Sequence, residues 1–116
     1  MKKYECVISN IRLISVNKKY KNHPSYSQCK EYLMGLFQLF NVHNIKFTSP
    51  VHVLLFLSTN QDIDNNLKVI FDALEMAGIL ENDNLIRGLS VNFSDHVPHA
   101  VGKDSFKIII KDKTHG

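Results

Sequence analysis

The sequence predicts an α+β fold, in which one mixed β-sheet packs against two main helices. Residues 4–10 alternate between two faces, as expected for a half-buried strand. The segments 25–41 and 64–77 repeat apolar residues at helical spacing, and residues 51–57 are nearly all apolar. The resulting order, β(β)-α-β-α-β-β, implies a single mixed sheet with helices against it.

The first half of the chain predicts a strand followed by a long helix. The strand at 4–10 either ends there or continues to Val16 after a bend. A basic polar loop follows, and Ser25 opens the helix with Gln28 in a capping box. The helix runs to about Asn41. The apolar residues that recur at helical spacing along it are Tyr26, Cys29, Leu33, Leu36, Phe37 and Phe40.

The second half begins with the apolar run at 51–57, which predicts a central strand covered on both faces. A second helix is expected over 64–77, with Gly78 as the residue that ends it. Its buried stripe consists of Leu67, Ile70, Phe71 and Leu74. Residues 85–93 and 106–110 predict the last two strands. The lysines that alternate with apolar residues near the C-terminus suggest an edge strand protected by charge.

Length and composition favour one soluble domain over residues 1–116. The chain is 44% hydrophobic and 22% charged, which is typical of globular proteins. No apolar run approaches the ~20 residues needed to cross a bilayer, so no membrane partner is expected. Met-Lys-Lys leads into Tyr4-Glu5-Cys6 rather than an apolar stretch, so no export signal is predicted. Cys6 and Cys29 do not suggest a disulfide scaffold, and we expect a cytoplasmic protein.

The charge is distributed unevenly along the chain. Residues 62–83 contain six acidic side chains and one basic side chain, Lys68, which gives −5. Because the whole chain carries +3, the rest carries +8. A basic body with one acidic cluster suits a protein that attracts a polyanion and binds cations at one place. An acidic helix on an ordinary surface would give the same count.

Four residues in this acidic segment form a plausible catalytic site. Asp62 and Asp64 are two residues apart where the chain leaves the buried strand, so an extended backbone sends both carboxylates to one side. Lys68 follows Asp64 by one helical turn. If the strand after Asp83 lies beside the buried strand, Asp83 reaches the same rim. Three carboxylates suit Mg²⁺, and Lys68 could neutralise charge on a reacting phosphate.

The same residues also fit purely structural roles. Asp64 could be a helix N-cap, Asp62 a turn residue, and Asp83 part of an Asn/Asp-rich turn. Lys68 could simply pair with Asp72 at i+4. A calcium loop of the EF-hand type fits this segment less well, because it needs Gly and Glu where this chain has Leu67 and Ala73.

Residues 62–86 resemble the signature block of RusA-type Holliday junction resolvases. The matching residues are Asp62-Ile63-Asp64-Asn65, Lys68, Phe71-Asp72-Ala73-Leu74, Ala77-Gly78-Ile79-Leu80 and Asp83. Ser15-Val16-Asn17 is similar to the Ser-x-Asn element near the start of that family. The resemblance implies a RusA-like domain in which Asp62, Asp64 and Asp83 bind Mg²⁺ and Lys68 assists catalysis.

The resemblance also implies a homodimer that nicks opposing strands of a four-way DNA junction. The predicted DNA contacts are Asn17, Lys18, Lys19, Lys21 and Asn65, with a solvated basic loop as the alternative for the lysines. Two other functions remain open at this point. One is a nuclease for other branched DNA, and the other is a non-catalytic DNA- or partner-binding protein with the same fold.

Overall fold

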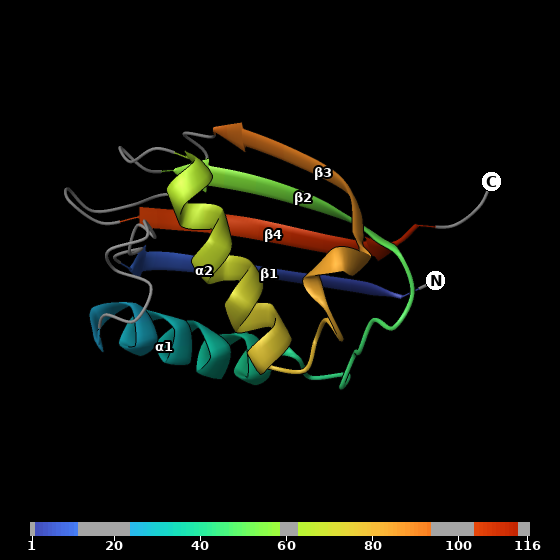
Figure 1. Cartoon of the computed structure of the whole chain (residues 1–116), viewed down its shortest axis with the longest axis horizontal. Helices are drawn as coiled ribbons and strands as arrows, with labels where there is room; N and C mark the ends of the chain where they lie inside the picture. Colours follow the sequence, from blue (N-terminus) through green and yellow to red (C-terminus); the bar gives the residue numbers. More distant parts are fainter. Residues whose placement is uncertain (1, 12–23, 59–62, 94–103, 114–116) are drawn as a thin grey trace.

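The computed structural model describes residues 2–11, 24–58, 63–93 and 104–113, with the side chains of 10, 24–25 and 63–66 left out. Four strands, two helices and one 3-10 turn lie within these ranges (Figure 1). In chain order they are β1 (Lys3–Ile11), α1 (Pro24–Phe40), β2 (Val51–Ser58), α2 (Ile63–Met76), η1 (Asp83–Leu85), β3 (Ile86–Phe93) and β4 (Asp104–Asp112). The predicted α+β class is confirmed. The proposed continuation to Val16 lies outside the described residues.

The strands form one mixed sheet in the order β1-β4-β2-β3. β2 and β3 are parallel, whereas β4 is antiparallel to both β1 and β2. The prediction that the C-terminal strand lies at an edge was wrong, because Lys107 of β4 pairs with Val7 on one side and Phe56 on the other. Alternating lysines therefore mark one open face of an interior strand here.

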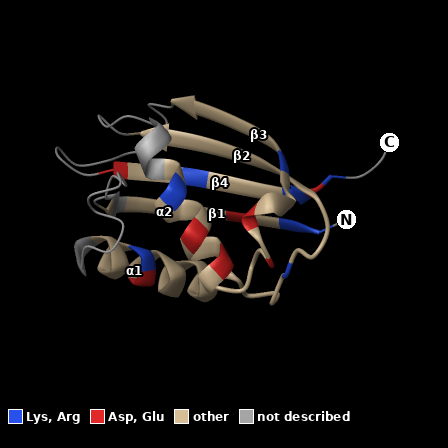
Figure 2. Cartoon of the chain, in the orientation of Figure 1, with Lys and Arg blue, Asp and Glu red and all other residues tan. Residues whose placement is uncertain are grey.

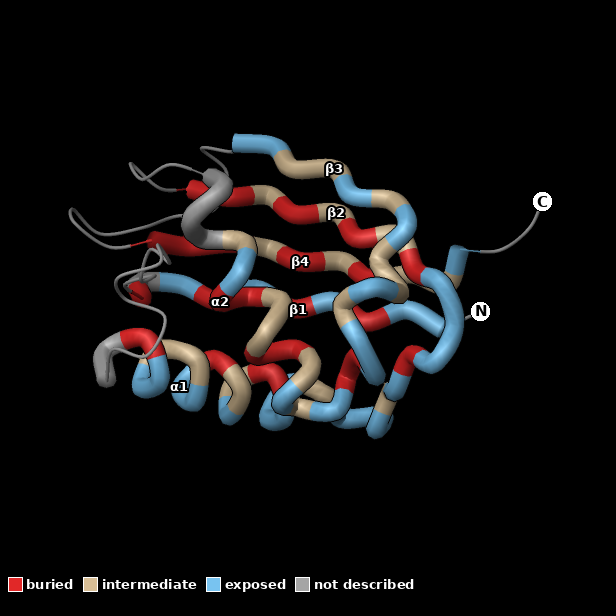
Figure 3. The backbone as a smooth tube through the Cα atoms, viewed as in Figure 1, coloured by how far each residue is buried: buried red, intermediate tan, exposed pale blue. Residues whose placement is uncertain are grey.

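Both helices lie against the same face of the sheet (Figure 1). The residues of β2 consequently alternate between buried and half-buried along the strand, as the banding in Figure 3 shows. Val53 and Leu55 are fully buried on the helix side, while Leu54 and Phe56 are half-buried on the other. The prediction that β2 is covered on both faces was therefore wrong, because no described element packs on its second face.

Helix α1 closely follows the predicted span. Leu33 and Phe37 are buried, but Phe40, the last residue of the helix, is 44% exposed, contrary to its predicted place in the core stripe. The Tyr4 hydroxyl donates a hydrogen bond to the Phe37 carbonyl at 2.9 Å, and the two rings meet edge to face. These contacts join β1 to α1. The Ser25 side chain of the predicted capping box lies outside the described residues.

Helix α2 ends at a glycine, as predicted. Gly78 has φ of 79°, a conformation that glycine adopts without strain. Its N–H donates to the Glu75 carbonyl at 3.0 Å, and the N–H of Ile79 donates to the Leu74 carbonyl at 3.1 Å. These two bonds form a Schellman motif, which turns the chain sharply off the helix. The buried stripe of α2 is Val69, Ile70, Ala73 and Leu74, with Leu67 and Phe71 half-buried.

Two further predictions concern disulfide bonds and membrane-spanning helices. No disulfide joins Cys6 and Cys29, and Cys6 is buried. Within the part of the chain that the structure describes, neither helix is long and apolar enough to cross a membrane.

Candidate active site

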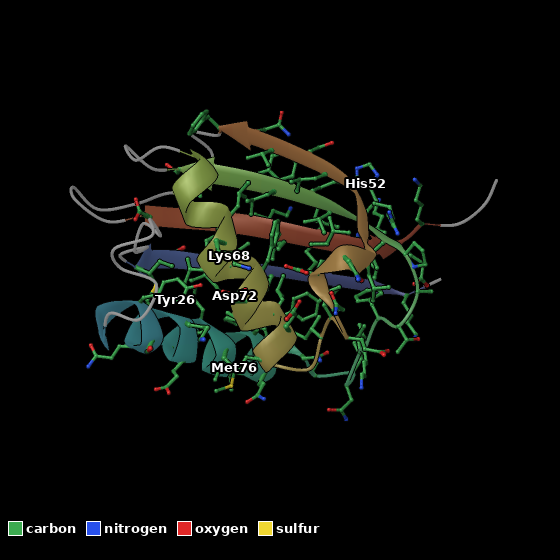
Figure 4. All side chains as sticks on the ribbon, viewed as in Figure 1. Tyr26, His52, Lys68, Asp72 and Met76 are labelled. Carbon is green, nitrogen blue, oxygen red and sulfur yellow. The ribbon has the colours of Figure 1, made fainter. Side chains whose placement is uncertain are left out.

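The candidate site lies along one side of α2. Lys68, Asp72 and Glu75 occupy positions i, i+4 and i+7, so they follow one stripe of the helix. Figure 2 shows the basic residue of α2 followed by acidic ones, with further acidic residues in the segment after the helix. Figure 4 labels Lys68 and Asp72 on α2 and Tyr26 at the start of α1. The site is therefore built by two helices and the segment that leads into β3.

Lys68 contacts carboxylates from two elements. Its Nζ lies 3.1 Å from Oδ1 of Asp72 on α2 and 3.8 Å from Oδ2 of Asp83 in η1. The hydrogen bond to Asp72 raises the pKa of Lys68, and the charges of Asp72, Asp83 and Glu75 add to this effect, while burial opposes it. The ammonium group is therefore held positively charged, and the side chain remains 48% exposed to solvent.

Asp72 joins Lys68 to the other helix. Its second carboxylate oxygen, Oδ2, accepts a hydrogen bond from the Tyr26 hydroxyl of α1. Tyr26 is only 3% exposed, and burial, reinforced by Asp72, holds the pKa of its hydroxyl above the usual range. Tyr26 therefore keeps its proton and acts as the donor. The Lys30 ammonium lies 5.6 Å from the centre of the Tyr26 ring, a distance typical of a cation–π contact.

Asp83 is positioned by hydrogen bonds to its backbone and to its neighbours. Asn82 caps the 3-10 turn, because its side-chain oxygen accepts from the N–H of Asn84 at 2.9 Å. The N–H of Asp83 itself donates to the Glu75 carboxylate. The side chain of Asp83 is left 42% exposed and faces Lys68. The turn thus presents one carboxylate beside the only basic residue of α2.

An open hollow adjoins these groups. It has a volume of about 530 Å³ and is lined by Lys30, Lys68, Asp72, Glu75, Met76 and Glu81. A water molecule occupies ~30 Å³ of liquid, so the hollow has room for a phosphodiester group and several waters. Lys68 places a positive charge at its wall.

The sequence predicted that Asp83 lies near the C-terminal end of β2. This prediction was wrong. β3 does lie beside β2, but the two strands are parallel, with Val51 opposite Ile86 and Leu57 opposite Phe93. The start of β3 therefore lies at the opposite end of the sheet from the exit of β2. Asp83 approaches the site because α2 runs back along the sheet and the turn η1 packs against it.

The predicted residues are only partly described. The structure brings Lys68 and Asp83 together, with 3.8 Å between Nζ and Oδ2. Asp62 lies outside the described residues, and so do the side chains of Asp64 and Asn65 at the start of α2. The predicted DNA contacts Asn17, Lys18, Lys19 and Lys21 also lie outside them. Among the described residues, no group of three or more His, Cys, Asp or Glu side chains could hold a metal ion. The Mg²⁺ site therefore remains a prediction.

The sequence reasoning missed two residues of the site, Tyr26 and Glu75. Tyr26 was assigned only to the core stripe of α1, whereas its hydroxyl bonds Asp72, 46 residues away. Glu75 could have been found, because it continues the i, i+4, i+7 stripe of Lys68 and Asp72. The structure also contains the contact between Lys68 and Asp72 that the structural alternative anticipated.

The fold and the site together define a small α+β domain. Its site combines acidic and basic side chains of helix α2 and of the adjoining turn η1. Its sequence matches the family described as Endodeoxyribonuclease RusA over residues 9–110, and the chain belongs to that family. It is also 36% identical over 69 residues to a protein of Aquifex aeolicus named crossover junction endodeoxyribonuclease RusA. That match covers 58% of this chain and 50% of the relative's length.

Proposed function

We propose that this chain is a Mg²⁺-dependent DNA endonuclease that resolves four-way junctions. One observation carries the proposal: within the RusA-family block, Lys68 lies 3.8 Å from Asp83 and 3.1 Å from Asp72 beside an open hollow. A fixed cation next to exposed carboxylates matches what phosphodiester hydrolysis needs, since charge develops on the phosphate in the transition state.

Each residue has a distinct role in this proposal. Asp62, Asp64 and Asp83 would hold Mg²⁺, because hard carboxylate oxygens are the ligands that this ion prefers. The bound metal would supply Lewis acidity toward the phosphate and a more acidic water. Lys68 neutralises charge that develops on the phosphate oxygens. Asp83 is suited to its role because its side chain is 42% exposed and its backbone is held by Glu75.

The charge of the remaining chain supports DNA as the substrate. Outside residues 62–83 the chain carries +8, which attracts a polyanion toward the acidic site. We assign DNA contacts to Asn17, Lys18, Lys19, Lys21 and Asn65. The lysines would contact phosphates and so contribute affinity rather than sequence preference.

A homodimer belongs to the same proposal. A four-way junction has near two-fold symmetry, and its resolution requires two matched nicks. One chain has one such acidic cluster, whereas a closed two-fold dimer has two in fixed relative orientation. We therefore propose that two copies of this chain act together, and light scattering at micromolar concentration tests this point.

The decisive experiment compares three labelled DNA substrates. Purified protein is incubated with a four-way junction, a flap and a plain duplex, each with and without Mg²⁺. We expect paired symmetric nicks in the junction, dependence on Mg²⁺ and little cleavage of the duplex. Faster cleavage of the flap would support the second candidate, a nuclease for other branched DNA. Binding to the junction without cleavage under any metal condition would support a non-catalytic DNA-binding protein instead.

A further inference from the structure

The contacts of Lys68 indicate how its ammonium group is held in position. Lys68 extends from the exposed side of α2, and a lysine has several rotatable bonds, so an unsupported ammonium group would sample many positions. Its Nζ instead lies 3.1 Å from Oδ1 of Asp72, one helical turn later. The reach of Lys68 toward Asp83 is thus set by its bond to Asp72.

Asp72 is in turn fixed from the opposite side. The Tyr26 hydroxyl of α1 donates to Oδ2, so the two oxygens of one carboxylate are used by two different partners. Tyr26 is almost fully buried, which anchors its ring. A carboxylate held by a buried donor has little freedom to rotate, and the direction of its other oxygen is fixed as well.

The geometry points to Asp72, held by Tyr26, as the positioning residue that places the Lys68 ammonium beside Asp83 and the open hollow. Asp72 lines the hollow, but in this scheme it contacts neither the metal nor the phosphate and acts through Lys68. The inference rests on the proposed endonuclease function for its kinetic consequence. Its structural part, the fixing of the ammonium group, is independent of any activity.

The exposed ion pair alone would not support this inference. Salt bridges at i, i+4 on a helix surface contribute little to stability, because solvent and salt weaken them. The additional observation is the buried hydroxyl of Tyr26, which orders the carboxylate from the core side. An ordinary surface pair has no such support.

The structural part can be tested by NMR of the lysine side-chain ammonium groups. We expect the Lys68 ammonium to give a resolved signal with slow solvent exchange and high order in the wild-type protein. Asp72→Asn should abolish this signal, and Tyr26→Phe should lower its order while leaving the fold intact. Glu81→Gln is the matched control, since it removes one negative charge from the lining of the same hollow. An equally ordered Lys68 ammonium in wild type, Asp72→Asn and Tyr26→Phe would overturn the inference.

The kinetic part uses a double-mutant cycle with single-turnover cleavage of a four-way junction. Asp72→Asn should slow cleavage roughly 10- to 100-fold, since small misplacement of a catalytic group has effects of this size. Junction affinity should change by less than about threefold, because the interaction serves the transition state. In a Lys68→Ala background, Asp72→Asn should cause no further slowing.

The outcomes separate the inference from the proposed function. If Asp72→Asn slows cleavage equally with and without Lys68, Asp72 acts independently and the inference fails while the endonuclease stands. If the wild-type protein cleaves no branched DNA, the proposed function fails. The NMR comparison then decides the positioning role alone. Should Asp72→Asn not fold, Tyr26→Phe provides the same comparison by removing a single hydroxyl.

Discussion

The backbone N–H of Asp83 donates a hydrogen bond to the carboxylate of Glu75, eight residues earlier in the chain. This bond ties the turn η1 to the end of α2, on the same helical stripe that carries Lys68 and Asp72. A predicted metal ligand is therefore positioned through its backbone by a carboxylate that needs no contact with the metal. The separation between Asp83 and Lys68 depends on this link.

The first prediction concerns Glu75. Glu75→Gln keeps an acceptor oxygen for the Asp83 N–H, so it should retain most of the cleavage rate. Glu75→Ala removes that acceptor, and we expect it to slow junction cleavage about tenfold or more and to raise the Mg²⁺ concentration needed for half-maximal rate. Mg²⁺ titrations of single-turnover cleavage measure both effects. Glu31→Ala, which removes an exposed carboxylate on α1, is the control.

Two results would speak against this role for Glu75. One is a Glu75→Ala variant with a wild-type response to Mg²⁺. The other is an equal defect in Glu75→Gln and Glu75→Ala, which would show that the charge of Glu75 matters more than its hydrogen bond.

The second prediction concerns the segment between α2 and η1. Phe47 and Leu80 form a parallel bridge, in which the N–H of Phe47 donates to the Ile79 carbonyl and its own carbonyl accepts from Glu81. Phe47 is fully buried, so Phe47→Ala should lower the free energy of unfolding by about 3–5 kcal/mol. Urea unfolding measures this loss.

The same domain offers a control for the Phe47→Ala substitution. Phe93, at the end of β3, is 63% exposed, and Phe93→Ala should change stability by less than about 0.5 kcal/mol. Similar losses for the two variants would contradict the assignment of Phe47 to the core.

The fold could largely be predicted because its elements have local signals. Alternation in β1, the helical spacing of α1 and α2, and Gly78 all act within a few residues of one another. Strand order is not local. β4 carries the alternating lysines typical of an edge, yet it lies between β1 and β2, because pairing depends on residues far along the chain. The same limit explains why β2 was predicted to be covered on both faces.

In the site, too, local contacts could be predicted from the sequence and long-range contacts could not. Lys68 and Asp72 are one helical turn apart, so their pairing could be read from the sequence. The bond from Tyr26 to Asp72 spans 46 residues and depends on how α1 packs against α2, for which the sequence contains no direct signal. Asp83 was placed near Lys68 by a mistaken argument from strand ends. The actual approach depends on the direction in which α2 runs back along the sheet.

The third prediction concerns alkaline pH. Burial raises the pKa of the Cys6 thiol to about 11, from its usual value of 9.0. The folded state therefore binds this proton more tightly than the unfolded state. The resulting stability is complete below pH 9 and is lost as the pH rises from 9 to 11. We expect a loss of about 1–3 kcal/mol over this range, since one pKa unit corresponds to about 1.4 kcal/mol.

Urea unfolding of wild type and Cys6→Ala between pH 7 and 11 isolates this contribution. The variant is less stable at pH 7 because it loses buried volume, but the difference between the two proteins should shrink above pH 9. A constant difference across the whole range would show that Cys6 does not titrate with the unfolding transition.

The fourth prediction concerns the acidic residues that we assign to Mg²⁺. Asp62→Asn, Asp64→Asn and Asp83→Asn should each reduce junction cleavage by at least about 100-fold, because each removes a charged oxygen ligand. Junction affinity should stay the same or increase, because each substitution also removes a charge that repels phosphate. The pairing of cleavage and binding assays separates a metal ligand from a residue that only stabilises the fold.

Asp83 gives the sharpest version of this test, because its surroundings are described. Asp83→Asn keeps the backbone N–H that bonds Glu75, so the turn should remain in place and the melting temperature should change little. It also removes one of the charges that raise the pKa of Lys68. Glu31→Gln, at an exposed position of α1, is the control for loss of one carboxylate charge. Near-normal cleavage by all three site variants would remove the acidic cluster from catalysis, and the nuclease site would then have to lie elsewhere in the chain.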